Sequence, residues 1–222
     1  ITVPNDAACD GLLEHDKYRN EFIVNHIVHC FNESDDIRGC VITSRRNTMS
    51  LIYKILLDIF GPESVYILDA KCAIKSTAMI LSSLARDKRK YILVSTKQNI
   101  GTGVDIPSIN TLFVHHFETN DTYIRQMVGR IMRQQDAHPR VVYLYTFMSL
   151  MDHPKSIRII SKMKSEFKKA FPDWHEDAKS YKFHHVMDDL WVKMINDFSI
   201  TENKPRSSYS SYKRYYQPLK LV

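Results

Sequence analysis

The sequence has few of the features that mark secreted, metal-stabilised or membrane proteins. Its four cysteines, at 9, 30, 40 and 72, form no C-x-x-C pair and no zinc-finger spacing, so we expect free thiols and no metal site. No apolar run approaches the ~20 residues that cross a bilayer, and the first residues show no signal peptide. We therefore expect an intracellular protein in a reducing compartment, without a membrane partner. Because the first residue is Ile1 rather than Met, we expect the chain to belong to a longer protein.

The composition is that of a globular protein with a moderate basic bias. A length of 222 residues suits one domain plus an extension, and 44% hydrophobic residues are enough for a sizeable core. The formal net charge of +6 is compatible with a polyanion as partner without proving one.

Short apolar runs alternate with helical patterns along the first two thirds of the chain. Helices are expected at 16–31, at 49–60, where Gly61-Pro62 closes the helix, and at about 76–86. The expected strands are 40–43, 65–68, 91–95, 111–114 and 141–146. This alternation predicts a parallel, doubly wound α/β sheet, in which ligands bind beyond the carboxyl ends of the strands. Ser44 and Thr96 would lie at those ends.

A further helix is expected around 126–133, with two distinct faces. Its apolar stripe consists of Ile124, Met127, Val128 and Ile131. Gln126, Arg130 and Arg133 lie on another side, where two guanidinium groups one turn apart suit the charge of a triphosphate. The alternative is a solvated basic face. Asp121 or Thr122 is expected to cap this helix, and Gly129 suggests close approach of another backbone.

The stretch 92–107 combines an apolar run, a polar glycine-bearing turn, and then Asp105 and Pro107. It resembles motif V of superfamily 2 helicases, and Gln126 to Arg133 matches the Q-x-x-G-R-x-x-R pattern of their motif VI. The resemblance implies a RecA-like parallel sheet flanked by helices. Because the chain has no G-x-x-x-x-G-K-[ST] loop and no DEAD or DEAH context, it implies the second RecA-like domain only, at about 37–150.

The resemblance also implies roles for individual residues. Arg130 and Arg133 would reach the γ-phosphate of ATP, and Gln126 would position water or phosphate. Gly101, Gly103 and Asp105 would contact the nucleotide, whose Mg²⁺ would be held by a first RecA-like domain. Ser44, Arg45 and Thr96 would contact nucleic acid, DNA or RNA, as a single strand. For Ser44, capping of the next helix is an equally good reading.

Met127 stands where many relatives carry a second arginine, which places the chain outside the DEAD-box RNA helicases. It more closely resembles the DNA-translocating and transcript-releasing helicases of phages and large DNA viruses. The histidine pairs at 115–116 and 184–185 lack a Cys or acid at ligand spacing, so we expect structural or surface histidines.

The expected organisation has four parts. A lead-in and first helix occupy 1–36, the RecA-like domain 37–150, a helical extension 151–200 and a basic Tyr/Ser-rich tail 201–222. Residues 155–169 carry six Lys or Arg against Glu166, and the tail interleaves tyrosines with Lys213 and Arg214. Both features suit phosphates and stacked bases. The alternatives are a solvated helix face and tyrosines packed on the domain.

The resulting hypothesis is the C-terminal motor domain of an ATP-dependent helicase or translocase, inactive as an ATPase when isolated. Two alternatives remain open. One is a non-catalytic nucleic-acid-binding module on the same fold. The other is a protein-interaction module that works through the extension and tail.

Overall fold

The computed structural model describes residues 17–69, 74–86, 89–101, 108–116, 120–131, 141–145, 161–162, 164–166, 168–169, 176–178 and 218–221. The helices are α2 (Lys17–Glu33), α3 (Arg46–Phe60), α4 (Ile74–Arg86), α5 (Lys97–Gly101) and α6 (Asp121–Ile131). The strands are β1 (Arg38–Thr43), β2 (Val65–Leu68), β3 (Tyr91–Thr96), β4 (Thr111–Val114), β5 (Val141–Tyr145), β6 (Glu176–Ala178) and β7 (Pro218–Leu221). In these ranges no helix has the length and apolar character that crossing a membrane requires.

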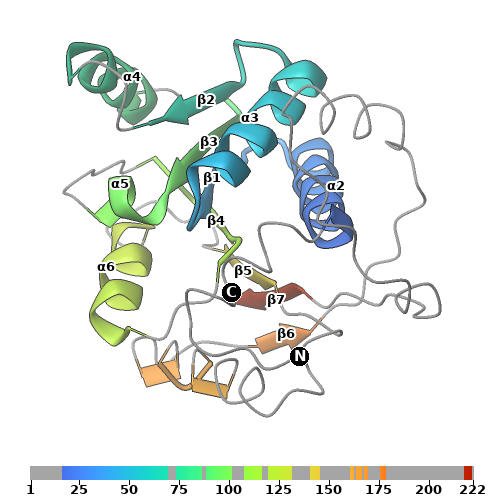
Figure 1. The fold of residues 1–222 in the computed structure, drawn as a ribbon, viewed down its shortest axis with the longest axis vertical. Coiled ribbons are helices and arrows are strands. Elements are labelled where there is room, and N and C mark those ends of the chain that lie inside the picture. The colour runs from blue at the N-terminus through green and yellow to red at the C-terminus, as the bar shows by residue number, and fades with distance from the viewer. Residues whose placement is uncertain are drawn as a thin grey trace.

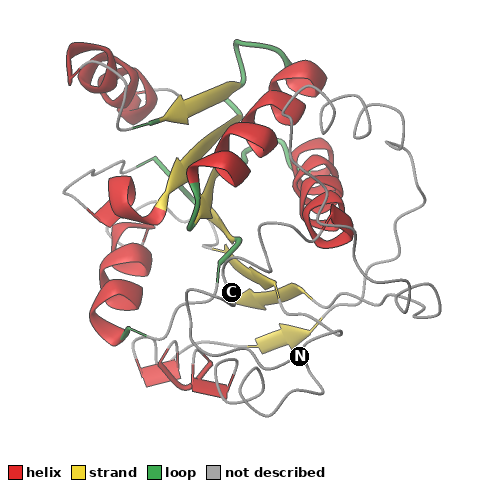
Figure 2. Cartoon of the chain, viewed as in Figure 1, coloured by secondary structure: helices red, strands yellow, loops and turns green. Residues whose placement is uncertain are grey.

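The strands form one sheet in the order β2-β3-β1-β4-β5-β7-β6 (Figure 2). The first five are parallel, as the sequence predicts, and β7 and β6 join the β5 edge in antiparallel pairing. Each run that the sequence analysis identified as a strand is a strand of this sheet. The RecA-like α/β fold is therefore confirmed.

The register of the strands explains why β1 and β3 read as continuous apolar runs. Val94, Val41, Phe113 and Tyr143 stand side by side across β3, β1, β4 and β5, and all four belong to one buried cluster. Residues of α2 and α3 complete that cluster, so these two helices cover this face of the sheet. Neighbouring strand residues such as Ile42 are also fully buried and point to the opposite face. Both faces are thus shielded.

Right-handed crossovers place the remaining helices. The connection from β1 through α3 runs toward β2, whereas the connections that follow β2, β3 and β4 run back across the sheet. The helices α4, α5 and α6 therefore share the face opposite α3, and α5 and α6 are in contact (Figure 1). The connection after β1 runs in one direction across the sheet, and the connections after β3 and β4 run in the other. A crevice is therefore expected beyond the carboxyl ends of β1 and its neighbours.

Two helix ends test the capping predictions. Gly61 ends α3 with φ +78°, and its N–H donates to the Leu57 carbonyl (2.9 Å), as expected for a helix closed by glycine. At α6 the prediction was wrong. Neither Asp121 nor Thr122 is the cap, because Asn120 precedes the helix and its Oδ1 accepts the Tyr123 N–H (3.0 Å).

Three other segments differ from expectation. The polar turn after Thr96 is a short helix, α5, because Thr96 Oγ1 accepts the Asn99 N–H (3.5 Å) and starts a helical turn. A helical extension was expected over 151–200, yet Glu176–Ala178 is strand β6. The end of the expected tail is strand β7, which pairs with β5. Helical residues between 161 and 169 agree with the predicted basic helix.

Candidate nucleotide- and nucleic-acid-binding site

Helix α6 has the two faces that its sequence indicates. Ile124 and Met127 are buried, at 0% and 2% exposure, and Gln126 is exposed. Arg130 follows Gln126 by one turn in the same helix. Its side chain, like the whole of Arg133, lies outside the described residues.

The space beside Gly129 is open. A Cβ added there would meet no heavy atom within 4 Å in the described part of the chain. The expected close approach to another backbone is therefore not found there.

The carboxyl ends of β1 and β3 bring the predicted nucleic-acid residues together. Thr43 pairs with Thr96 in the register, so Ser44 and Arg45 leave β1 beside the start of α5. Arg45 is exposed and occupies the N-cap of α3 in an extended conformation, without a side-chain cap bond. The capping alternative for Ser44 is thus not what the structure shows.

The hydroxyl of Thr96 is only partly available. The residue is 7% exposed, and its Oγ1 accepts the Asn99 N–H (3.5 Å). Asn99 Nδ2 and Ser95 Oγ both donate to the Leu68 carbonyl, at 2.8 and 3.0 Å. The β3–α5 junction is therefore fixed to the end of β2 by side-chain hydrogen bonds.

An ion pair lies next to this edge. Arg46, in the first turn of α3, donates its Nε to Asp69 Oδ1 (2.9 Å), just after β2. The Arg46 side chain is 40% exposed and the Asp69 side chain 19%, so solvent screens the pair and its contribution to stability is small. Its local effect is on charge, because Asp69 compensates Arg46. The neighbouring Arg45 is exposed at the same edge.

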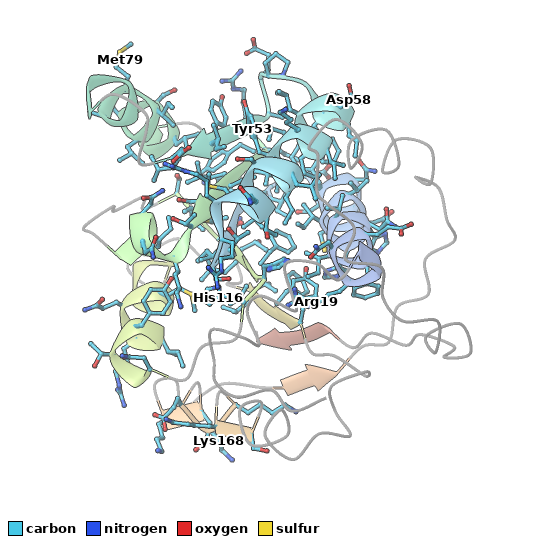
Figure 3. The ribbon with its side chains drawn as sticks, in the orientation of Figure 1. Arg19, Tyr53, Asp58, Met79, His116 and Lys168 are labelled. Atoms are coloured by element: carbon cyan, nitrogen blue, oxygen red, sulfur yellow. The ribbon has the colours of Figure 1, made fainter. Side chains whose placement is uncertain are left out.

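Two buried histidines follow β4. Arg19 Nη1 donates to His115 Nε2 (3.0 Å), and its other terminal nitrogen donates to the His115 carbonyl. Burial first, and then the nearby Arg19 and His116, hold the pKa of His115 well below its ordinary value. Both histidines are structural, in agreement with the expectation. Figure 3 labels Arg19 at the lower end of α2 and His116 below α3.

His116 links three elements. Its Nδ1 lies 3.3 Å from the Ile42 carbonyl of β1, and burial, with a smaller effect of Lys97, lowers its pKa to about 3. The neutral ring therefore carries its proton on Nδ1 and donates it to that carbonyl. Its face meets the ring of Tyr123 on α6 edge-on, with centroids 6.0 Å apart.

Tyr123 also joins α6 to α5. Its hydroxyl donates to the Lys97 carbonyl (3.3 Å). Tyr123 was not predicted as a site residue, although it precedes Gln126 by three positions and Arg130 by seven and so shares their side of the helix. That spacing was the available signal.

The other predicted positions are distributed as follows. Gly101 is the last residue of α5, whereas Gly103, Asp105 and His184–His185 lie outside the described residues. Within the described ranges, His, Cys, Asp and Glu nowhere gather in threes at metal-binding distances. Cys30 and Cys40 are free thiols.

The basic helical segment is exposed where it is described. Lys162, Lys168 and Lys169 are all exposed, and Lys169 pairs with Glu166 at 2.9 Å. That pair occupies the one acid of the segment 155–169. Lys168 is labelled in Figure 3.

The parallel sheet and its strand order are those of a RecA-like domain, and the two motifs of the chain resemble motifs V and VI of superfamily 2 helicases. The family described as helicase conserved C-terminal domain matches residues 20–135, and the chain belongs to it.

Similar curated proteins come from poxviruses. Transcript termination protein A18 of cowpox virus is 39% identical over 143 residues, which are 64% of this chain and 28% of that protein. Transcript termination protein OPG145 of variola virus is 38% identical over the same extent. The chain thus spans little more than a quarter of the length of these relatives. The expected kinship with helicases of large DNA viruses is confirmed.

Solved structures give weaker likenesses. The crystal structure of T4 UvsW has a TM-score of 0.49 and 15% identity, covering 59% of this chain and 25% of that one. Mss116p DEAD-box helicase domain 2 bound to an RNA duplex has a TM-score of 0.48 and 16% identity, covering 57% and 49%.

Proposed function

We propose that this chain is the second motor domain of an ATP-dependent nucleic-acid helicase or translocase. One observation carries the proposal. Helix α6 buries Ile124 and Met127 and presents Gln126 to solvent, with Arg130 one turn later in the same helix. Such a helix can offer an amide and a guanidinium group to a phosphate without disturbing the core.

The donor set fits a nucleotide phosphate. Guanidinium groups give planar, permanently charged donors that suit phosphoryl oxygens, and the open space beside Gly129 leaves room for a second domain to approach. Bound ATP would supply the phosphoryl group that is transferred to water. The residues of this chain would bind and orient it: Arg130 and Arg133 at the γ-phosphate, Gln126 at water or phosphate, and Gly101, Gly103 and Asp105 at the nucleotide. The Mg²⁺ ion would be held by the first RecA-like domain.

The nucleic acid would follow the carboxyl edge of the sheet. Thr96 ends β3, and Ser44 and Arg45 follow the neighbouring strand β1, because Thr43 and Thr96 are paired. An exposed Arg45 supplies positive charge for a phosphate, and phosphate contacts position a strand without reading its sequence.

The arginine assignment is tested in the full-length protein. Arg130→Ala and Arg133→Ala should each lower nucleic-acid-stimulated ATP turnover by ~10³-fold or more, because an arginine finger stabilises charge that develops in the transition state. The matched control is Arg125→Ala, which removes an exposed arginine from another side of α6. It should leave turnover within about twofold of the original.

Thermal unfolding of all three variants completes the test. The midpoints should stay close to the original, because the arginines do not belong to the apolar stripe. Full turnover in both Arg130→Ala and Arg133→Ala would overturn the assignment of these arginines to the γ-phosphate.

A further inference from the structure

Tyr123 lies between the two parts of the proposed site. It stands in the first turn of α6, on the side that carries Gln126 and Arg130, and it is half-buried. Its hydroxyl donates to the Lys97 carbonyl (3.3 Å). Lys97 directly follows Thr96, the residue proposed to meet nucleic acid, so one side chain connects the finger helix to the nucleic-acid edge.

The carbonyl that Tyr123 contacts belongs to a well-fixed junction. Lys97 begins α5, and the Thr96 hydroxyl caps the same turn through the Asn99 N–H. Asn99 is in turn bonded to the end of β2 through the Leu68 carbonyl (2.8 Å). A phosphate bound at Thr96 would therefore shift or stiffen the turn that Tyr123 holds.

A second contact ties Tyr123 to the same edge. Its ring packs edge-on against His116, with centroids 6.0 Å apart. His116 donates to the Ile42 carbonyl at 3.3 Å, and Ile42 lies between Ser95 and Val114 in the register. The tyrosine thus contacts two points that are both fixed to the carboxyl ends of the central strands.

Docking of α6 does not require this hydroxyl. Ile124 and Met127 are almost completely buried and already provide the apolar contact of the helix with the domain. If Tyr123 contributed only packing, a phenylalanine at this position would serve equally well. The hydroxyl adds a directional bond between α6 and α5, whose length and angle depend on how the two helices are placed.

We propose that Tyr123 is a positioning residue that transmits occupancy of the nucleic-acid edge at Thr96 and Lys97 to the α6 face with Gln126 and Arg130. This inference rests on the proposed function. It assigns to one hydroxyl group the dependence of ATP turnover on bound nucleic acid.

The test is Tyr123→Phe in the full-length protein, with Tyr66→Phe as the matched control. Tyr66 also donates to a carbonyl, that of Glu63 (3.1 Å). This bond lies at the amino end of β2, opposite the carboxyl ends of the strands where the proposed site lies. ATP turnover is measured without nucleic acid and with saturating oligo(dT) or oligo(U). Tyr123→Phe should lower the ratio of stimulated to unstimulated turnover about three- to tenfold, the factor that one hydrogen bond supplies. Tyr66→Phe should not change it.

The outcomes separate the two proposals. A stimulation ratio in Tyr123→Phe equal to that of Tyr66→Phe would overturn the role of Tyr123 and leave the motor function standing. Equal losses of stimulated and unstimulated turnover, with a lower unfolding midpoint, would show a merely structural tyrosine and also overturn it. If the unaltered protein hydrolyses no ATP with either oligonucleotide, the proposed function itself fails.

Discussion

At the scale of single residues, the interior holds uncharged histidines. His26 is fully buried, its Nδ1 lies 2.8 Å from the Tyr145 hydroxyl, and its ring packs edge-on against Tyr143 (4.6 Å between centroids). Burial first, and a nearby His29 second, lower the pKa of His26 to about 3. The pKa of His116 is lowered to a similar value. These side chains are therefore uncharged aromatic core residues at neutral pH, and their protonation opposes folding.

This burial predicts acid sensitivity. The pKa of His26 is near 3 in the folded chain and about 6.5 when unfolded, so between these values the unfolded chain binds the extra proton. The contribution of each such histidine to the free energy of unfolding is fully present above about pH 6.5. It falls as the pH drops toward 3, by roughly 1.4 kcal/mol per pH unit. Urea unfolding between pH 4.5 and 8 measures this slope. His26→Phe should reduce it most, whereas His29→Phe, at an exposed position of the same helix, should reduce it less, because His29 is the smaller cause of the lowered pKa of His26.

Part of the proposed site can be read from the sequence at this scale. Gln126, Arg130 and Arg133 follow from a spacing within eight residues, which a one-dimensional pattern contains. The contact of Arg19 with His115 joins positions 96 residues apart, and no local pattern encodes it. Tyr123 is an intermediate case. The sequence indicates its position on the helix face, but it does not indicate the hydrogen bond to the Lys97 carbonyl.

At the scale of elements, α6 depends on a cap that lies before the predicted one. Asn120→Ala should lower the free energy of unfolding by ~0.5–2 kcal/mol, because the Tyr123 N–H loses its acceptor. Thr122→Ala, at an exposed residue inside the helix, should change it by less. Urea denaturation of both variants gives the comparison, and a larger loss in Thr122→Ala would contradict the assignment of the cap.

The five parallel strands were predictable because each is a run of apolar residues, and the sheet buries β1, β3 and β4 on both faces. Three elements were not. Helix α5 has five residues, too few for a helical period to show. Strands β6 and β7 are short and exist through pairing with each other and with β5, a tertiary effect that local composition does not contain. The domain boundaries stay a prediction, although α2 packs into the same core as the sheet.

At the scale of the whole molecule, the segment 201–222 contains both the basic residues Lys213 and Arg214 and the strand β7. The effects of the charge and of the strand can be tested separately. Lys213→Gln with Arg214→Gln removes charge and leaves β7 in place. If the tail binds nucleic acid, the log–log slope of single-strand affinity against salt should decrease by ~0.7 for each phosphate that the tail no longer neutralises. Truncation after residue 200 should do the same and also reduce stability, because β5 loses its partner strand. Fluorescence anisotropy with labelled oligonucleotides at several salt concentrations measures the slope.

The matched control for this experiment is Lys54→Gln with Arg89→Gln, which neutralises two exposed cations elsewhere on the domain. An unchanged slope in the Lys213 and Arg214 double variant would show that the tail does not bind nucleic acid. Its role would then be structural, through β7.

The pairing of β5 with β7 also sets an order of events in time. Strand β5 ends at Tyr145 and β7 begins at Pro218, so 218 − 145 − 1 = 72 residues separate them. A ribosome that adds ~5–20 residues per second needs roughly 4 to 14 seconds to make that segment. During this interval the outer edge of β5 exposes unpaired N–H and C=O groups that can recruit a strand from another nascent chain. The late synthesis of β7 should therefore affect the aggregation of nascent chains more than the stability of the finished protein.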